Sequence, residues 1–516
     1  MKKYIYIAFA ALSLVSCKLD DNISQNDPGV EQVTPNLYLS AAQTSNYNVE
    51  VGDIFELSNV WMNNWAGNIY YFASPYSAEY QLQITSAFTR GNNFWNNGYT
   101  AMARYANIYN HPQADKYAHH AAIAKILMAN SMQYIVDFYG DAPFSEAFKR
   151  EANLTPKYDK GEDIYRSLVL MLNEAIQTID TVTPQFEVGT EDEIYGGQMG
   201  NWKKLANTIK LRLLLRQSKV TDSQVRAFVD AQLQTLQGAQ FLSENIDSDA
   251  TINPGYNNSN ATQQNPLIRN YSYLIFDQSA VNTNGYRLID LSSHFAGLLN
   301  GTNAKTASIT DPRRGSMYRA VGGTLRGITQ GEGQLPGATE ASFSRLGWKF
   351  YEVANGAIKE NSNINGYIMT IAESELLQAE AAELYPAIFS NAQGHYNQAI
   401  AASFRFFGLS ASQATAYANN LSTRPYGWNG ADGHIAAIQY QRMIALHFVK
   451  PQETYINYLK TGYPVTPLAL TATQPNKPWR LVYPAREYNT NSSNVPNVTQ
   501  ADVFVKNQFT PFWNRN

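Results

Sequence analysis

Apolar residues recur every three or four positions in several long stretches of this chain, and this spacing restricts the fold to one built mainly from helices. The clearest stripe, within residues 164–179, consists of Ile164, Leu168, Leu172, Ala175 and Ile179. Stripes of the same kind predict further helices within residues 202–213, 371–384, 396–407 and 435–449. The dominant element of the fold is therefore expected to be a helix with one buried face.

Residues 117–137 are apolar on most sides of a helix, but polar side chains interrupt them along their whole length. We therefore predict a helix buried in the core rather than a membrane span. Gly140 and Pro143 follow within a few residues and predict where this helix ends. The interrupting residues are His119, Lys125, Asn130, Gln133 and Asp137.

The helical stripes come in neighbouring pairs with small residues at the expected contacts, which is typical of tetratricopeptide-like stacking, although no clear repeat of about 34 residues is visible. Residues 247–301 and 311–337 show little periodicity and are rich in Asn, Gly, Ser and Thr. Both stretches are too long to be ordinary connections. We predict a mainly α fold: a scaffold of helix pairs with an irregular, loop-rich second region and few strands.

The composition excludes some functions and favours another. A net charge of −3 and a charged fraction of 16% leave no basic stripe for nucleic acid, so no nucleic-acid partner is expected. The chain is long enough to bury a large core without a metal or disulfide staple. Its 34 Tyr, 23 Phe and 8 Trp residues, with many amides, predict a surface that suits uncharged polar ligands.

The N-terminus has the order of a secretory signal: Lys2 and Lys3, an apolar stretch of about a dozen residues, and Ser16 directly before Cys17. Spanning a bilayer takes about 20 residues, so a permanent anchor helix is not expected. The Leu-Val-Ser-Cys order resembles the bacterial lipobox, in which the cysteine is acylated after cleavage; an ordinary signal with an incidental cysteine is the alternative. We predict a signal peptide over residues 1–16, a lipid tether over 17–35 and a globular region over 36–516, with loop-rich segments at about 247–345.

Several segments in order along the chain resemble the SusD/RagB family of nutrient-binding outer-membrane lipoproteins from Bacteroidetes, most closely its SusD-like branch. The resemblance extends from about residue 107 to residue 489. Its segments are YGDAPF at 139–144, DPR at 311–313, AESELLQAEA at 372–381, QYQRMIAL at 439–446 with Glu453, TGYP at 461–464, and Trp479 followed by YPAREYN at 483–489.

This resemblance implies tetratricopeptide-like helix pairs, no catalysis, no cofactor and a position at the outer membrane of the cell. It further implies a hinged lid over a SusC-like TonB-dependent barrel, to which captured glycans or peptides are delivered. The acidic pair Asp20 and Asp21 resembles the export tag that sends such lipoproteins to the outer face; a solvated acidic linker is the alternative.

A sugar site needs flat apolar faces for C–H groups and planar polar groups for hydroxyls. Aromatic and amide residues are densest near residues 61–81, the N-terminal region that family ligand sites often use. A second cluster lies at 92–99, and a loop group consists of Tyr256, Tyr271, Tyr273 and Tyr286. The alternative is that these rings are core, since aromatic side chains are mostly buried. The residues predicted to bind the ligand are Trp61, Asn63, Asn64, Trp65 and Tyr76.

Catalytic and metal-binding patterns do not assemble in the sequence. The seven His residues show no dense ligand spacing, and with Cys17 acylated no zinc site is expected. Glu373, Glu375 and Glu380 could form an acid–base pair for glycoside hydrolysis, but glutamates with structural partners in a helix are the stronger interpretation. A surface hydrolase and a helical scaffold without a small ligand therefore stay as alternative hypotheses.

Overall fold

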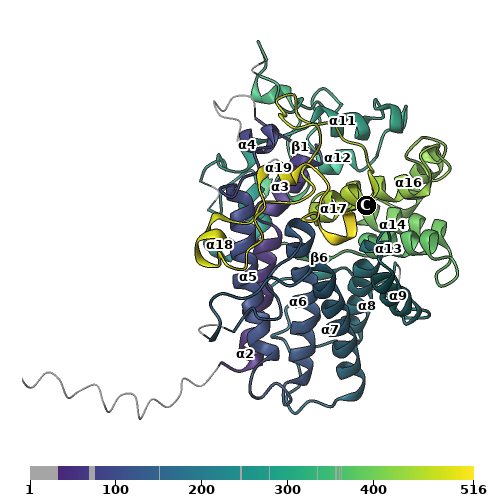
Figure 1. Ribbon diagram of the computed structural model, residues 1–516. Coiled ribbons are helices and arrows are strands. Elements are labelled where there is room, and N and C mark those ends of the chain that lie inside the picture. Colours follow the sequence, from purple (N-terminus) through teal and green to yellow (C-terminus); the bar gives the residue numbers. More distant parts are fainter. Residues whose placement is uncertain are drawn as a thin grey trace, which may run out of the picture.

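A computed structural model describes residues 33–68, 76–149, 152–244, 247–277, 279–333, 335–354, 357–359, 361 and 363–515, with only the backbone given for 352–354 and 357–359. The fold is mainly helical (Figure 1), which confirms the predicted class. Cys17, Asp20 and Asp21, with the predicted signal segment and nearly all of the tether, lie outside the described residues.

Helices carry most of the regular structure. The α-helices are α2 Pro35–Glu50, α3 Asp53–Trp61, α4 Ser77–Gln81, α5 Thr89–Tyr109, α6 Ala118–Tyr139, α7 Gly161–Thr181, α8 Met199–Arg216, α9 Ser223–Gln234, α10 Pro266–Tyr271, α11 Ser293–Asn300, α12 Arg314–Met317, α13 Ile371–Leu384, α14 Ala392–Phe406, α15 Ala411–Leu421, α16 His434–Leu446, α17 Pro451–Thr461, α18 Ala485–Thr490 and α19 Gln500–Val503. Short 3₁₀ turns are η2 Ala261–Gln263, η3 Tyr286–Leu288, η4 Ala304–Thr306, η5 Glu340–Ser342, η6 Trp348–Phe350 and η7 Phe512–Asn514.

Strands are short and pair in twos, giving three antiparallel sheets in the part of the chain that the structure describes. β1 pairs with β3, β2 with β6, and β4 with β5 as a hairpin. The first two sheets join segments far apart in sequence and thereby hold irregular loops to the helices. The strands are β1 Trp65–Gly67, β2 Ala250–Ile252, β3 Ile289–Leu291, β4 Glu352–Ala354, β5 Ala357–Lys359 and β6 Gly366–Met369.

Helix α6 lies at the centre of the helical part of the molecule, packed between α5 and α7. Every residue of α6 except Lys125 is buried, which explains why this segment is apolar on most sides. Lys125 reaches Glu174 on α7 at 2.5 Å. Helix α7 buries a single stripe that includes Leu168 and Leu172, while Leu170 on its other face is 49% exposed. The two sequence patterns thus separate a central helix from an outer one.

The predicted helices are confirmed, with small differences at their ends. Helix α13 has the predicted bounds, whereas α14 begins at Ala392 rather than at residue 396. The first turn of α14 is Ala-Gln-Gly-His, so it carries no apolar stripe by which to be recognised. In the same way, α8 extends beyond the predicted residues 202–213 at both ends.

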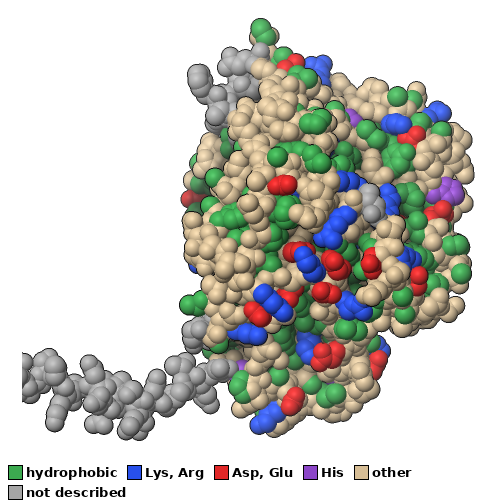
Figure 2. Space-filling model, viewed as in Figure 1, with side chains coloured by type: hydrophobic (Ala, Val, Ile, Leu, Met, Phe, Trp, Pro, Cys, Tyr) green, Lys and Arg blue, Asp and Glu red, His purple; other side chains and the backbone are tan. Residues whose placement is uncertain are grey.

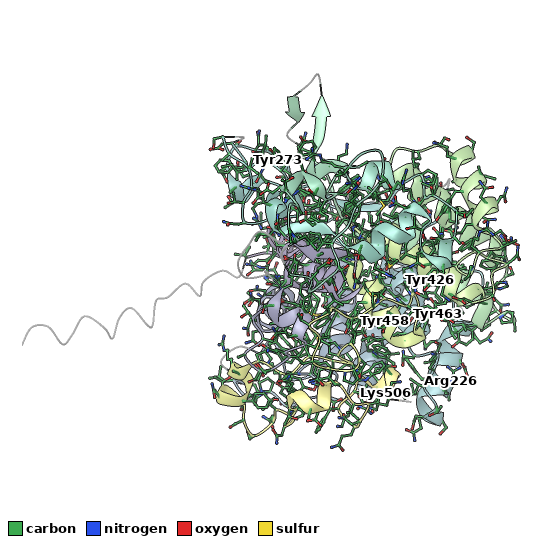
Figure 3. All side chains as sticks on the ribbon, turned by 90° about the horizontal axis from the view of Figure 1, so that it is seen from above. Arg226, Tyr273, Tyr426, Tyr458, Tyr463 and Lys506 are labelled. Carbon is green, nitrogen blue, oxygen red and sulfur yellow. The ribbon has the colours of Figure 1, made fainter. Side chains whose placement is uncertain are left out.

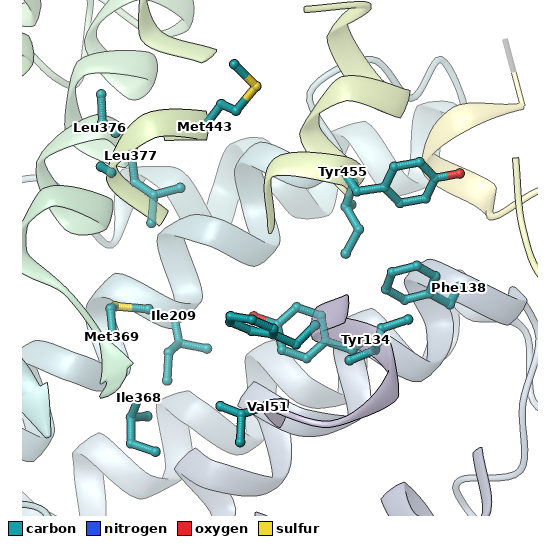
Figure 4. Packing of buried hydrophobic residues seen from close by; sticks show 14 of the residues in the cluster. Val51, Tyr134, Phe138, Ile209, Ile368, Met369, Leu376, Leu377, Met443 and Tyr455 are labelled. Atoms are coloured by element: carbon teal, nitrogen blue, oxygen red, sulfur yellow. The ribbon is translucent and has the colours of Figure 1, made fainter. Parts of the chain in front are cut away.

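The hydrophobic core of the helical part lies between α6, α8, α13, α16 and α17, with β6 at one side (Figure 4). Ile209, Met369 and Leu376 are fully buried there, and Tyr134 and Tyr455 place their rings in the same region. Burying side chains of this size contributes about 1.5–3 kcal/mol each. The helix pairs are therefore held together mainly by the apolar stripes from which they were predicted.

Charged side chains also pair inside this core and form a buried ion-pair network. Arg212 contacts Glu373 at 2.7 Å, and each of these side chains is only 1% exposed. Arg216 contacts Glu453 at 2.7 Å with the same exposure. Burying unpaired charges is costly, so such groups persist in an interior only in pairs. The network further includes Asp137, Glu380, Arg442 and Lys460.

One buried pair joins two segments that lie far apart in the sequence. Lys450, directly before α17, pairs with Glu50, the last residue of α2, which lies 400 residues earlier. Asn130 on α6 donates to the same carboxylate at 2.9 Å. Three distant helices are therefore fixed at one carboxylate.

Helix α6 ends at Gly140, whose φ of 78° falls in the region that favours glycine. A Cβ atom at this position would lie 3.0 Å from the backbone oxygen of Phe509. The chain then turns into the YGDAPF segment, where the carboxylate of Asp159 accepts the N–H groups of Phe144 and Ser145. This turn places the loop after α6 against α5 and the C-terminal part of the chain.

Residues 247–361 form the loop-rich region. Its longest α-helix, α11, has eight residues, and its other elements are shorter still. On the face shown in Figure 2, Lys, Arg, Asp and Glu gather across the middle of the molecule, and the part above them is mainly uncharged. The predicted contrast between a helical scaffold and a loop-rich second region is confirmed.

Candidate functional site

The five residues predicted to bind a ligand all lie in the interior. Trp61 is 4% exposed, Asn63 3%, Asn64 1%, and Trp65 and Tyr76 0%. This placement favours the alternative that these side chains belong to the core. They offer almost no exposed surface with which to contact a ligand.

The two tryptophans are buried because both flank the turn from α3 into β1, which packs against the helices. The ring of Trp61 lies 5.1 Å from that of Tyr455 on α17. Trp65 donates from Nε1 to Nε2 of His447 at 3.3 Å, and the hydroxyl of Tyr318 lies 2.5 Å from the same nitrogen. Burial lowers the pKa of His447 well below its usual value, so the ring is neutral and has one acceptor nitrogen to offer these two neighbours.

The two asparagines and Tyr76 have structural partners as well. Asn63 has a φ of 53°, a left-handed conformation that asparagine tolerates better than most residues. Asn64 donates from Nδ2 to Oδ1 of Asn59 at 3.0 Å. The guanidinium of Arg90 lies 5.6 Å from the centre of the Tyr76 ring. These contacts stabilise the turn into β1 and the start of α4.

The loop tyrosines separate into two groups. Tyr256 and Tyr271 are buried, whereas Tyr273 is half-buried and faces two other tyrosines. Its ring centre lies 5.2 Å from that of Tyr286 and 4.9 Å from that of Tyr351. Figure 3 shows Tyr273 at the end of the molecule from which a two-stranded hairpin projects. The structure therefore brings two of the four loop tyrosines together with a third that the sequence did not single out.

An arginine completes this group. The guanidinium carbon of Arg319 lies 3.7 Å from the centre of the Tyr351 ring, and Arg319 is exposed. Tyr351 is half-buried, and Tyr286 is 1% exposed beneath it. We call the set Tyr273, Tyr286, Arg319 and Tyr351 the tyrosine patch.

Backbone hydrogen bonds between three loop segments hold the tyrosine patch in place. The N–H of Tyr273 donates to the carbonyl of Phe350 at 2.9 Å, and the N–H of Arg319 donates to the carbonyl of Arg345 at 2.9 Å. The hydroxyl of Tyr286 donates to a further carbonyl, that of residue 346, at 2.9 Å. The exposed rings therefore rest on a fixed frame, although no long helix supports them.

Beneath the patch lies a buried carboxylate. Asp290 is 2% exposed and lies 3.4 Å from Nε of Arg345. Burial raises the pKa of Asp290 to about 7, against the opposite effect of Arg345. Burial also raises the pKa of Tyr286 to about 12, so its hydroxyl stays protonated at neutral pH.

The patch can hold an uncharged polar molecule by two kinds of contact. The half-exposed rings of Tyr273 and Tyr351 offer apolar area for C–H groups. The exposed guanidinium of Arg319 presents several N–H donors in one plane, suited to hydroxyl and carbonyl oxygens. This is the combination expected of a saccharide site.

The carboxylates considered for hydrolysis are buried and partnered. Glu373 pairs with Arg212, and Glu375 accepts the N–H of Glu244 at 2.8 Å and lies 2.6 Å from Nδ1 of His395. Burial would raise the pKa of Glu380, but Lys460 and Arg442 lower it to about 2. These side chains hold helices together, as the structural interpretation of the sequence predicted.

Metal ligands do not cluster within the described residues, where no group of three or more His, Cys, Asp and Glu side chains could hold an ion. Asp247 pairs with Lys204 at 2.5 Å. Asp249 accepts the N–H of Ile371 at 2.7 Å. Both aspartates thus have structural partners.

Sequence reasoning missed Arg319 and Tyr351, which complete the patch. Arg319 lies in the aperiodic stretch 311–337, and Tyr351 follows it by 32 residues. The sequence offered one indication of this site. Trp348, Phe350 and Tyr351 form a dense aromatic group in a segment without helical periodicity. Their pairing with Tyr273 is set by loop contacts that no local spacing encodes.

The described helices include none that is both long and apolar enough to cross a membrane. The fold and the patch define a mainly helical protein that presents an aromatic surface on irregular segments. Residues 27–484 match the SusD-like family described as "Starch-binding associating with outer membrane", and the chain belongs to this family.

Solved structures share this fold. A chitin-binding SusD homologue from Flavobacterium johnsoniae is 20% identical, with a TM-score of 0.68 over 92% of this chain and 98% of that one. A SusD homologue from Parabacteroides distasonis is 18% identical, with a TM-score of 0.73 over 94% and 98%. A comparison with curated protein sequences gives no match. At this level of identity the structures establish the fold, and the ligand has to be argued from the residues.

Proposed function

We propose that this chain is a lipid-anchored, surface-exposed binding protein that captures glycans at the tyrosine patch and delivers them to a SusC-like TonB-dependent barrel. The observation that carries the glycan assignment is the exposed Arg319 over the half-exposed ring of Tyr351, beside Tyr273. The family description and the chitin-binding relative point to the same ligand class.

A glycan fits the patch better than a peptide does. An extended peptide is usually bound through backbone hydrogen bonds along a strand edge or through a groove with side-chain pockets. The patch instead offers two ring surfaces and one planar donor group. A binding role without catalysis is also favoured, since the candidate acid–base carboxylates are buried and paired.

The test is binding of maltotriose, diacetylchitobiose and a panel of short peptides to the protein lacking residues 1–17, measured by isothermal titration calorimetry. We expect a saccharide to bind and Tyr351→Ala to weaken that binding about tenfold or more, because stacking area is lost. The matched control is Tyr385→Ala, since Tyr385 is also half-buried and has the guanidinium of Arg226 at 6.0 Å from its ring. Tyr385 lies at the end of α13, away from the patch.

Three results would contradict the proposal that glycans bind at the tyrosine patch. The first is binding of peptides but of neither saccharide. The second is an equal effect of Tyr351→Ala and Tyr385→Ala on saccharide binding. The third is saccharide binding that survives Tyr351→Ala unchanged, which would remove the patch from the proposal.

The anchor and the transporter require separate tests. Cys17→Ala should release the protein from the membrane fraction, because the predicted acylation site is lost. Protease treatment of intact cells should cleave the wild-type protein, and replacement of Asp20 and Asp21 by alanine should reduce this cleavage if the pair acts in export. Co-purification of a large barrel protein in mild detergent would support delivery, and a monomer without any partner would contradict it.

A further inference from the structure

A cavity lies on a different part of the molecule, lined by residues of α5, of the loop after α6 and of α18. Its volume is about 330 Å³, at the small end of the range for ligand pockets. None of its lining residues belongs to the tyrosine patch. The chain segments that build it include the aromatic and amide cluster at residues 92–99, which the function proposed above does not use.

Aromatic rings form one wall of this cavity. Trp95 and Tyr99 come from α5, with ring centres 4.9 Å apart, and Phe148 lies 5.9 Å from Tyr99. The hydroxyl of Tyr99 donates to the carbonyl of Pro143 at 2.7 Å, which fixes the ring. Leu154 at the same cavity is 78% exposed. The wall therefore offers apolar area to a ligand and is rigid on the side of the helix.

The opposite side is polar, and two of its groups have no partner within the described part of the chain. Among the described residues, the side chains of Asn96 and Arg486 make no hydrogen bond or ion pair. Glu487 accepts the hydroxyl of Tyr158 at 2.7 Å, which orients its carboxylate. Arg486 and Glu487 balance each other in charge, so the cavity favours a neutral ligand.

The backbone conformation of Phe148 is a further indication of a ligand site, independent of the side-chain contacts. Phe148 has a φ of 63°, in the left-handed region that a bulky residue rarely adopts. Such conformations persist only where the surroundings enforce them, and they concentrate at ligand sites. Here the conformation directs the ring of Phe148 toward Tyr99 at the cavity wall.

We propose that this cavity is a second binding site, separate from the tyrosine patch, for one or two rings of a neutral saccharide. The rings of Tyr99 and Phe148 contact the C–H face of the sugar, and Asn96, Arg486 and Glu487 bond its hydroxyl groups. A glycan chain bound at both sites would be held at two points, which raises its apparent affinity when the chain spans them.

The test uses maltotriose and diacetylchitobiose as probes, with the protein lacking residues 1–17, in ligand-observed NMR and calorimetry. We expect Tyr351→Ala to retain saccharide binding at the cavity. Adding Asn96→Ala and Arg486→Ala should weaken this remaining binding about tenfold, because hydrogen bonds from the cavity, including those of the charged Arg486, are lost. Asn419→Ala, at an exposed asparagine on α15, is the control. Unchanged melting temperatures would show that all variants are folded.

The outcomes separate the two sites. If Tyr351→Ala alone removes all binding, the cavity holds no saccharide, and the second site is overturned while the patch stands. If the Asn96→Ala, Arg486→Ala variant alone removes all binding, the cavity is the site and the patch proposal fails. Absence of any saccharide binding to the wild-type protein overturns both.

Discussion

In the helical part, charged side chains lie in the interior and pair with one another, whereas in the loop-rich region tyrosine rings reach the surface. Arg216 and Glu453 are each 1% exposed, but Arg319 over Tyr351 is open to solvent. In the helical part, buried ion pairs such as Arg212–Glu373 add to the apolar packing. In the loop-rich region, backbone hydrogen bonds such as that between Tyr273 and Phe350 hold the tyrosine patch. Side chains that are not needed to hold a fold together are available for ligands, so the loop-rich region is where binding is expected.

The largest effect should follow from breaking the buried network. Arg216→Met leaves Asp137 buried without its cation and leaves Glu453 with Arg212 alone, and we expect the free energy of unfolding to fall by about 3–5 kcal/mol. The measurement is urea denaturation followed by circular dichroism. Saccharide binding to the folded fraction should stay unchanged, because the network does not contact the patch.

The control for this variant is Lys203→Met on the same helix. Lys203 pairs with Asp180 at the surface, where the two side chains are 36% and 45% exposed. Exposed pairs contribute about 0–1 kcal/mol. If Arg216→Met were no more destabilising than Lys203→Met, the buried network would add nothing to the stability of the helical part, and the contrast between the two regions would be lost.

The second effect is an opposite response to pH of two buried carboxylates, Glu380 in the helical part and Asp290 in the loop-rich region. Glu380 has a lowered pKa, so its contribution to stability is present above its unfolded pKa and lost as pH falls toward about 2. Asp290 has a raised pKa, so stability is greatest below about pH 4, its unfolded value, and is lost as pH rises toward about 7.

Replacement of Asp290 isolates the contribution of this carboxylate to the pH dependence of stability. In Asp290→Asn, we expect the free energy of unfolding to fall less between pH 4 and pH 7 than it does in the wild type. The difference between the two falls should be about 1 kcal/mol or more. Urea titrations at several pH values measure the slope. An identical slope in both proteins would show that Asp290 ionises normally in the folded state.

The smallest effect on stability should come from Arg319→Ala. Arg319 is exposed and makes its ring contact at the surface, so we expect the free energy of unfolding to change by less than about 0.5 kcal/mol. Saccharide affinity should nevertheless fall about tenfold. Arg319→Lys should recover only part of it, because an ammonium group lacks the planar donor fork. Full recovery by lysine would mean that charge alone matters at the patch.

The helices and the fold class could be predicted from the sequence because an apolar stripe is a local property. The roles of the glutamates could be predicted as well, since a helix dense in acidic residues needs partners, and Glu373 and Glu380 have them. The surface was harder to predict. Trp61 and Trp65 have the composition of a sugar site but fill the core, because the pairing of β1 with β3 carries that segment inside.

The patch itself depends on contacts between loops. Tyr273, Arg319 and Tyr351 lie far apart in sequence, and backbone bonds between their segments bring them together. No spacing rule connects such residues, so the composition could indicate only that tyrosines matter in this region. The cluster at residues 92–99 was recognisable as aromatic and amide-rich, but its cavity depends on Arg486 and Glu487 near the other end of the chain.

The pairing of Glu50 with Lys450 also bears on how the molecule forms. Contacts between residues so distant in sequence raise the contact order, and loop closure over that span slows folding. During synthesis, the side chain of Glu50 at the end of α2 has no Lys450 to pair with until nearly nine-tenths of the chain has been made. The interior can therefore close only late in synthesis, which leaves the growing polypeptide open for longer than a protein built from local contacts.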